Sequence, residues 1–391
     1  MPRNPVVQSA LEIAARDLRW CYRERGIMTG SRLVYWSWDS FFASLGADCL
    51  GDTGTVKHNL ELYLGLQAEN GSLPKNIAHP LYFLKFVGLP IKEDSHKQRP
   101  NFSNAYFTAP SLTQNPTFVI ALHDYVTVSG DLAFFKKHAG AVEAIMRYLA
   151  SKESEFGLLK EGIGGGWAES VLKRGAIAFT NTCYARSAWC LSELYGMSGD
   201  TERSQHYLHV FAVLKDAIND VLWSDEDGGY YSDWYGHRRH HHFATDGNLL
   251  AIVWDIASKK QASCIEKRIA ELSLEDDVPI RLAYSRYSFW RVYIFNRLGG
   301  LKDYHVGFCW SWLGCVDVLA RLKMGKRKEA ETILAKIAAV IVRDGTVHEI
   351  YDKGRPVRNP FYKSEQPWAW GAGLFVKACY ALDYELTNHH A

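Results

Sequence analysis

The sequence of 391 residues lacks the features that mark several classes of protein. It has no apolar run long enough to span a membrane, and its first twenty residues contain no stretch of the signal-peptide type. Its 45 basic and 43 acidic residues nearly balance, so no excess charge favours nucleic acid or a membrane surface as a partner. We therefore expect a cytoplasmic protein with neither kind of partner.

Metal and disulfide patterns are missing as well. The eight cysteines are scattered without a CxxC pair, which indicates small core residues in a reducing compartment. The adjacent histidines at 240–242 lack the spacing of metal ligands. No metal and no other cofactor is expected. Because no linker rich in Pro, Gly or Ser divides the chain, residues 1–391 are expected to form a single domain.

Strand alternation is scarce, and residues 228–234 and 346–352 are the best short candidates. Apolar residues instead recur at helical spacing almost everywhere. Ser-Gly-Asp at 129–131 and at 198–200 supplies a glycine that ends one helix and an aspartate that caps the next. The pattern predicts helices at 6–25, 38–50, 54–69, 115–129, 132–151, 178–197, 201–222, 245–257, 260–272, 306–324, 326–343 and 366–383.

A dozen helices joined as hairpins form a repeat that closes either as an open solenoid or as a ring. The helix-to-helix turn recurs, but no longer sequence motif recurs with it, and this favours the ring. The longer connectors are rich in aromatic, glycine and charged residues, and such loops commonly carry function. We therefore predict an all-α fold, an (α/α)6 barrel with long decorated loops at one end.

One carboxylate stands in unusual surroundings. In the stretch YWSWDSFFASLGAD at 35–48, Asp39 lies among Trp36, Trp38 and two phenylalanines on what reads as the apolar face of a helix. A buried carboxylate is costly unless it is hydrogen-bonded or paired. Asp39 is therefore either a helix cap or a ligand-binding group. The 13 tryptophans and 21 tyrosines favour a cleft that stacks on flat polar ligands such as sugar rings.

Two glutamates are candidates for acid–base chemistry. Glu169 follows a run of glycines and lies two residues after Trp167, and a carboxyl beside an indole in a partly dry pocket suits a general acid. Glu349 lies in a short extended segment between His348 and Ile350, where it could serve as a general base. Each could equally be a solvated surface residue. An inverting glycosidase needs such a pair on opposite sides of the scissile bond.

These segments resemble the six-hairpin glycosidases of glycoside hydrolase family 63 type, which include trehalase, mannosylglycerate hydrolase and amylo-α-1,6-glucosidase. The resemblance is carried by YWSWDSFFASLGA, GSLPKNIAHP, SLTQNPTFVIALHDYVTVSGD, YHVGFCWSWLG and HEIYDKGRPVRNPFYKSEQPWAWGAGL, in the same order. It implies that Glu169 is the acid and Glu349 the base. Those families usually carry an aspartate as the acid, and Glu161 is the alternative here. The implied sugar-binding residues are Trp36, Trp38, Asp39, Asn76, Gln114, Asn115, Trp167, His305, Trp310, Trp312, Gln366 and Trp368.

The resulting hypothesis is an inverting, exo-acting α-glycosidase whose partner is a small carbohydrate. Its substrate would be an α-glucoside, an α-mannoside or the end of an α-glucan. One alternative on the same barrel is a sugar 2-epimerase of the N-acylglucosamine type, with His79, His305 and His348 as candidate bases. Another is a helical-repeat binding module without catalysis. Linkage, sugar configuration and oligomeric state stay open.

Overall fold

The computed structural model describes residues 4–82, 97–103, 109–284 and 287–386. Its α-helices are α1 Pro5–Trp20, α2 Ser37–Cys49, α3 Thr53–Leu64, α4 Gln114–Ser129, α5 Leu132–Ala150, α6 Ala178–Ser198, α7 Thr201–Leu222, α8 Thr245–Val253, α9 Lys259–Glu271, α10 Ile294–Leu298, α11 Ser311–Lys323, α12 Arg327–Asp344 and α13 Ala369–Ala381. Its strands are β1 Tyr22–Arg23, β2 Gly26–Ile27, β3 Val34–Trp36, β4 Asn76–Ala78, β5 Arg99–Asn101, β6 Ala176–Ile177, β7 Trp223–Ser224, β8 Tyr230–Tyr235, β9 Arg239–Phe243, β10 Cys309–Trp310, β11 Ile350–Asp352, β12 Arg355–Pro356, β13 Arg358–Asn359 and β14 Tyr362–Lys363.

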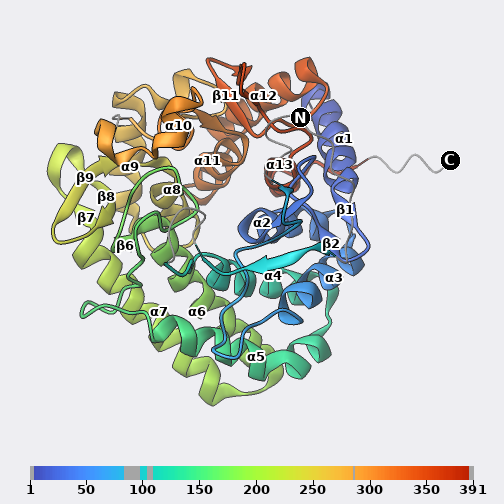
Figure 1. Cartoon of the computed structure of the whole chain (residues 1–391), viewed down its shortest axis with the longest axis vertical. Coiled ribbons are helices and arrows are strands. Elements are labelled where there is room, and N and C mark those ends of the chain that lie inside the picture. The colour runs from blue at the N-terminus through green and yellow to red at the C-terminus, as the bar shows by residue number, and fades with distance from the viewer. Residues whose placement is uncertain (1–3, 83–96, 104–108, 285–286, 387–391) are drawn as a thin grey trace.

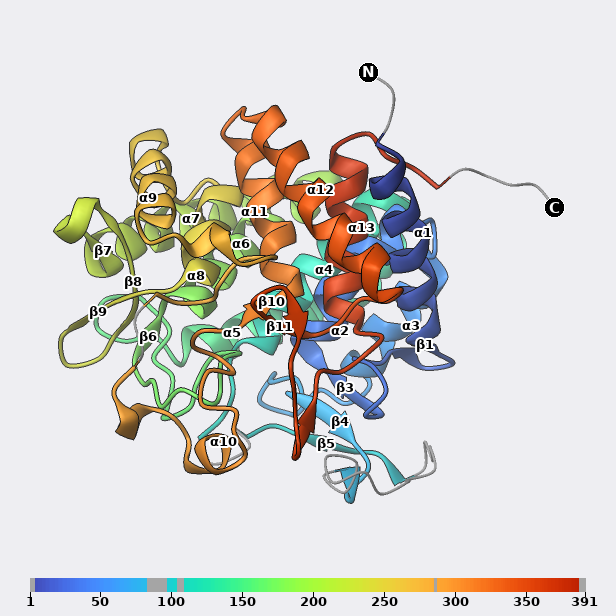
Figure 2. The same cartoon turned by 90° about the horizontal axis from the view of Figure 1, so that it is seen from above.

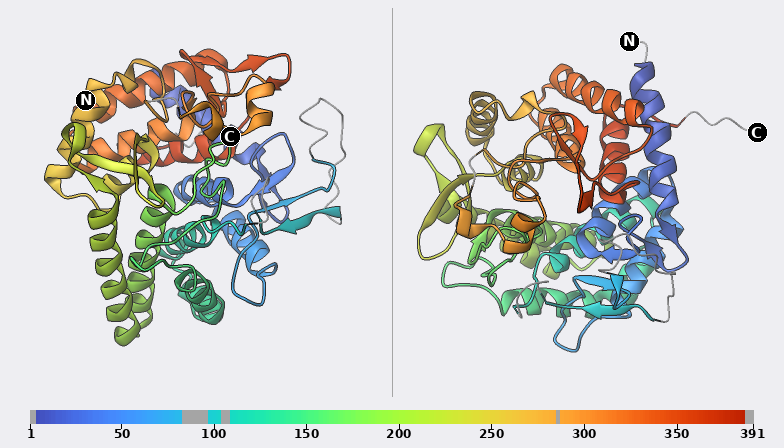
Figure 3. Two further views of the ribbon diagram at one scale, coloured as in Figure 1. Left: turned by 60° about the vertical axis from the view of Figure 1, so that its left-hand side comes forward. Right: turned by 45° about the horizontal axis from the view of Figure 1, so that its top comes forward.

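Twelve of the helices in the described part of the chain form two concentric layers (Figure 1). The inner ring is α2, α4, α6, α8, α11 and α13, each packed on the next, and it closes through contacts of α13 with α2. The outer helices α1, α3, α5, α7, α9 and α12 each pack on an inner helix. The chain's first and last helices, α1 and α13, lie side by side (Figure 3). This is an (α/α)6 barrel, as predicted, and the ring rather than the solenoid is correct.

The inner helices differ from the outer ones in composition. Nearly every residue of α2, α6, α11 and α13 is buried, whereas α7 and α9 bury a single stripe. A helix surrounded by other helices must be apolar or small on all sides. The inner ring meets this demand with alanine, glycine, serine and cysteine between its large aromatic residues. The eight cysteines are free, and six of them are buried.

The helix boundaries follow the sequence signals closely. Gly130 and Gly199 end α4 and α6 in the left-handed conformation, and the next residues, Asp131 and Asp200, cap α5 and α7. Five expected starts or ends differ by three residues or more. Two of them are the expected ends at 69 and 257, since α3 ends at Leu64 and α8 at Val253. The first helix ends at Trp20 because β1 and β2 form a hairpin there. The helix expected at 306 begins at Ser311 because Cys309 and Trp310 pair with β11, and the one expected at 366 begins at Ala369. The short helix α10 was not expected.

The short strands and long connections gather at one end of the barrel (Figure 2). Three of them, β3, β6 and β10, lead directly into the inner helices α2, α6 and α11. The N-termini of the inner helices therefore point to this end. Helix N-termini carry a partial positive charge that favours anionic groups. A site at this end is thus suited to hold carboxylates.

None of the described helices combines the length and apolar character needed to cross a membrane.

The crossing of α2 and α13 depends on two glycines. A Cβ at Gly46 would lie 2.2 Å from the carbonyl oxygen of Gly373, and a Cβ at Gly373 would lie 2.6 Å from the Cα of Ala43. Both obstacles are backbone atoms, so a side chain can be admitted only if a helix moves. We predict that Gly46→Ala lowers the free energy of unfolding by about 1–3 kcal/mol, the usual cost of overpacking. Chemical denaturation monitored by circular dichroism measures this.

Gly54 is the matched control. It lies in the first turn of α3, and a Cβ there would meet nothing within 4 Å. Gly54→Ala should leave stability unchanged or raise it by up to about 1 kcal/mol, since alanine is the better helix former. Equal effects of the two substitutions would show that the α2–α13 approach is not close.

Candidate active site

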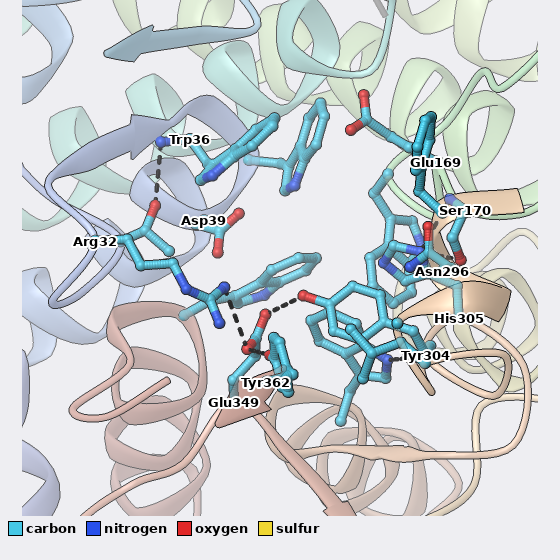
Figure 4. A pocket seen from close by; sticks show the side chains of 18 of the residues that line it. Arg32, Trp36, Asp39, Glu169, Ser170, Asn296, Tyr304, His305, Glu349 and Tyr362 are labelled. Carbon is cyan, nitrogen blue, oxygen red and sulfur yellow. Dashed lines mark hydrogen bonds and ion pairs between the residues drawn. The ribbon is translucent and has the colours of Figure 1, made fainter. Parts of the chain in front are cut away.

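A cavity of about 650 Å³ opens at the end of the barrel where the inner helices begin (Figure 4). Its walls come from segments far apart in the sequence, and polar groups project from them between aromatic rings. The described residues that line it are Thr29, Arg32, Trp36, Trp38, Asp39, Tyr82, Trp167, Glu169, Ser170, Phe295, Asn296, Gly299, Leu301, Tyr304, His305, Trp310, Glu349, Phe361, Tyr362 and Trp370.

Glu349 is fixed on one wall by hydrogen bonds to both of its carboxylate oxygens. The hydroxyl of Tyr304 donates to Oε1, and the hydroxyl of Tyr362 donates to Oε2 (Figure 4). Its backbone is held too: the Glu349 N–H donates to the carbonyl of Glu365, and its carbonyl accepts from Ser311 at the start of α11. Hydrogen bonds to the charged form stabilise a carboxylate. Four lone-pair positions on the two oxygens leave room for a further donor.

Arg32 joins this wall to a second glutamate. Its Nη1 lies 3.3 Å from Oε2 of Glu365 and 3.7 Å from Oε2 of Glu349. Its backbone N–H also donates to Oε1 of Glu365 at 2.7 Å, and its guanidinium lies over the ring of Tyr362, 4.9 Å from the centroid. One cation therefore offsets two carboxylates that burial would otherwise penalise.

Asp39 projects from the first turn of α2 toward the same group (Figure 4). Burial raises its pKa well above the usual range, and the negative charges of Glu349 and Glu365 raise it further, while a hydrogen bond from Trp368 opposes them. The carboxylate that the sequence places among rings therefore faces a cavity and is not a simple helix cap. It has room to bind a hydroxyl-bearing ligand there.

Glu169 lies on the opposite side of the cavity from Glu349 (Figure 4). Nζ of the fully buried Lys75 donates to its Oε1 at 2.7 Å, and the same ammonium lies 5.1 Å from the centre of the Trp36 ring. The next residue, Ser170, accepts a hydrogen bond from the backbone of Tyr293 at 2.8 Å. The glycine-rich loop that carries Glu169 is thus fastened at this point rather than free.

Tryptophans close the inner end of the cavity. Trp167 lies edge-to-face with Trp310, Trp312 and Trp370, at centroid distances between 4.9 and 5.5 Å. Its indole N–H donates to Asp246 of α8 at 2.6 Å, so this ring is locked in place. Trp312 and Trp370 stack at 4.3 Å behind it. The cavity is therefore a pocket with an aromatic floor.

His305 is held as a neutral ring. Its Nδ1 lies 2.9 Å from the Ser170 hydroxyl and accepts from the Ser170 N–H at 3.2 Å, and its ring stacks on Trp310 at 5.0 Å. Burial lowers its pKa well below the ordinary value, and the positive charge of Lys173 adds to the effect. Because Nδ1 accepts a hydrogen bond, the ring proton resides on Nε2.

Eight of the fourteen sequence-predicted site residues line the cavity: Trp36, Trp38, Asp39, Trp167, Glu169, His305, Trp310 and Glu349. Trp312 and Trp368 lie in the aromatic layer beneath it, both fully buried. The other four residues lie outside the lining.

Two of those four amides, Gln114 and Asn115, are hydrogen-bonded to backbone instead. Gln114 donates to the carbonyls of Leu73 and Ser111, and Asn115 accepts from the N–H of Leu73. Asn76 is buried in β4, and Gln366 is partly exposed just before α13. Glu161, the alternative acid, is also outside the lining, where it accepts from the Thr180 hydroxyl at 2.5 Å. Burial raises the pKa of Glu161.

Several functional residues were missed. Arg32, Tyr304, Tyr362 and Lys75 contact the two glutamates directly, and nothing in their local sequence distinguishes them from core or surface residues. Tyr304, Tyr362 and Lys75 do lie within segments that carry the family resemblance, and that was the available signal. The histidines 240–242 lie elsewhere: His240 and His242 stack on Trp234, and His241 pairs with Glu226.

Comparison with known sequences finds a family model that matches part of the chain. The trehalase family model matches residues 180–356, which include Tyr304, His305 and Glu349. This match covers less than half of the chain. The protein is a glycoside hydrolase. A search of curated protein sequences finds no match.

Solved structures resemble this glycosidase in fold at low sequence identity. A rhamnosidase from Klebsiella oxytoca with rhamnose bound is 18% identical with a TM-score of 0.69; the alignment covers 97% of this chain and 65% of that one. A family 63 mannosylglycerate hydrolase from Thermus thermophilus, in complex with Tris, is 15% identical with a TM-score of 0.70 over 94% and 99% of the two chains. A glycosidase variant in complex with glucose is 11% identical with a TM-score of 0.67 over 97% of each.

The raised pKa of Asp39 makes the stability of this glycosidase depend on pH. An unfolded aspartate titrates near about 3.9, whereas the folded chain keeps the Asp39 proton to higher pH. The unfolded state therefore binds fewer protons between these two values, and stability contributed by this group falls as pH rises. We predict that Asp39→Asn raises the melting temperature at pH 8 but not at pH 4, and that it lowers kcat/KM. Differential scanning fluorimetry across this pH range measures the difference.

Asp48, in the same helix, is the matched control. Burial, with the charge of Asp124, raises its pKa to about 8, and it lies outside the cavity. Asp48→Asn should give a similar gain in melting temperature at high pH without the loss of activity. If Asp39→Asn keeps full activity, Asp39 has no role toward the substrate.

Proposed function

We propose that this protein is an inverting, exo-acting α-glycosidase that removes one sugar from a small α-glucoside or α-mannoside or from an α-glucan end. The observation that carries the proposal is the pair Glu169 and Glu349 on opposite sides of one aromatic-floored cavity (Figure 4). Inverting enzymes place a general acid at the leaving oxygen and a general base at a water on the other face of the sugar.

Glu349 is proposed as the base. Two tyrosine hydroxyls donate to its carboxylate, and the Arg32 guanidinium lies 3.7 Å from it. In the proposed step this carboxylate accepts a proton from water. The same groups fix its orientation, which matters because the attacking water must lie in line with the bond that breaks. Asp39, beside it, is proposed to bind a hydroxyl of the sugar.

Glu169 is proposed as the acid, with Lys75 as the group that restores its proton. The two form an ion pair at 2.7 Å, so the Lys75 ammonium is a proton donor within hydrogen-bond distance of Oε1. In the proposed step a proton passes from Nζ to Oε1, and Glu169 passes it to the leaving oxygen. The proton that Glu349 takes from water balances the one that the leaving group receives.

The closed floor supports exo action. Among the described residues, the packed rings of Trp167, Trp310 and Trp370 would face the innermost sugar, and an exo-acting enzyme needs such a wall. The epimerase alternative has less support, because its candidate bases do not meet in the cavity. His305 lines it, whereas His348 and His79 are not among the lining residues. His79 accepts a hydrogen bond from the N–H of Leu81.

The two glutamates should respond differently to the leaving group. Glu169→Ala should reduce kcat on a natural glycoside by about 10²–10⁴-fold, the usual contribution of general acid catalysis, and should affect a glycosyl fluoride far less, because fluoride leaves without protonation. Glu349→Ala should impair both substrates. Steady-state kinetics with the two substrate types measure the contrast.

Glu161→Gln is the matched control, since Glu161 is a buried carboxyl eight residues earlier that does not line the cavity. It should leave the ratio of fluoride to natural activity unchanged. Glu161 is the acid instead if two results are found together. Glu169→Ala would reduce kcat equally on both substrate types, and Glu161→Gln would reduce kcat on the natural glycoside but not on the fluoride.

A further inference from the structure

Two phenylalanines at the cavity mouth are far more exposed than the function described so far requires. Phe295 is 67% exposed and Phe361 is 71% exposed, and both line the cavity. Single exposed apolar residues are ordinary on protein surfaces. Here two rings from segments 66 positions apart reach the same opening, and this convergence needs an explanation.

The two segments are tied together. The side chain of Asn359 donates to the carbonyls of Gly299 and Gly300, just after α10, at 3.2 and 3.4 Å. Its Oδ1 accepts from the N–H of Phe361 at 2.8 Å. The hairpin of β13 and β14 is therefore anchored to the end of α10. The backbone segments that carry the two phenylalanines are thus fixed relative to each other, and a fixed backbone lowers the conformational cost of binding.

The segment just before α10 is also anchored to the loop that carries Glu169. Val292 pairs with Val171, and the N–H of Leu172 donates to the carbonyl of Arg291 at 2.7 Å. Together with the bond from Tyr293 to Ser170, these contacts connect the segment that carries Phe295 to the segment that carries Glu169. The mouth therefore lies next to the proposed acid, on the side where the leaving group departs.

The chemistry of the mouth selects among possible leaving groups. An anionic aglycone needs a cation, but Arg32, the cationic side chain among the described lining residues, already faces Glu349 and Glu365. A second sugar needs several hydrogen-bonding partners. Among the described lining residues, 295–301 and Phe361 contribute two rings, Leu301 and the amide of Asn296. Tyr82 and Ser170 add one hydroxyl each, and that of Ser170 already faces His305. Phenylalanine has no polar atom and favours flat apolar surfaces.

We propose that the mouth phenylalanines form an aglycone site for an aromatic alcohol, so that the substrate is an α-glycoside of a phenolic or arylalkyl group. This inference rests on the proposed function for the sugar half of the substrate. It narrows the leaving group to a class with an exposed aromatic ring.

The test compares 2-phenylethyl and ethyl α-glycosides of glucose and mannose. Both leaving alkoxides have similar basicity, so the ratio of their kcat/KM values reports binding of the phenyl ring rather than bond cleavage. The wild-type enzyme should prefer the 2-phenylethyl glycoside by about tenfold, as expected for two aromatic contacts. The double variant Phe295→Ala/Phe361→Ala should bring the ratio close to one.

Trp20→Ala is the control, since Trp20 is 48% exposed at the end of α1 and does not line the cavity. This variant should retain the wild-type ratio. Circular dichroism establishes that the double variant is folded, and the single variant Phe361→Leu, which keeps an apolar side chain, should give an intermediate ratio.

A wild-type ratio near one, or a preference that survives the double substitution, overturns the inference. A second result would also overturn it. If sedimentation shows that the wild-type protein is a dimer and the double variant a monomer, the mouth is an interface between two copies. If neither glycoside is cleaved, the proposed function fails. Calorimetric titration then decides the inference: tighter binding of the 2-phenylethyl glycoside supports it, and equal affinities overturn it.

Discussion

The site depends on one electrostatic constraint, the placement of three buried carboxylates around a single guanidinium. Asp39, Glu349 and Glu365 would repel one another in a dry cavity, and Arg32 offsets part of that repulsion through Glu349 and Glu365. Burial, together with the charges of Glu349 and Glu365, raises the pKa of Asp39. The N-terminal ends of the inner helices face the same region and add favourable dipoles. Besides supporting the loops, the barrel orients its inner helices so that their dipoles lower the free-energy cost of burying these carboxylates.

The two proposed catalytic glutamates are stabilised by different means. Glu349 accepts hydrogen bonds from two tyrosine hydroxyls, which orient its carboxylate. Glu169 faces an ammonium group, which can give up a proton. The proposed roles of these two chemically identical side chains therefore differ because their environments differ, as in other paired-carboxylate enzymes. Tyr304 and Lys75 are as much a part of the proposed chemistry as the glutamates that they contact.

The sequence predicts the fold better than the site, for a physical reason. Helix spacing, the Gly-Asp turns and the capping aspartates are local signals, and all twelve expected helices are present. Asp39 could be singled out because its neighbours in the chain are themselves the rings around it. The partners of the glutamates could not be found in this way: Lys75 is 94 positions from Glu169, Tyr304 is 45 from Glu349, and Arg32 is 333 from Glu365. Packing of neighbouring hairpins brings the first two pairs together, and closure of the ring between α2 and α13 brings Arg32 to Glu365.

The central claim is that Glu169 and Glu349 act on opposite faces of the sugar without a covalent intermediate. Proton NMR during the first minutes of hydrolysis, before the released sugar equilibrates, tests it most directly. The account predicts that an α-glycoside first releases the β anomer. Release of the α anomer first would mean that configuration is retained and that one of the two carboxylates, or another group, attacks the sugar directly, which would contradict the account.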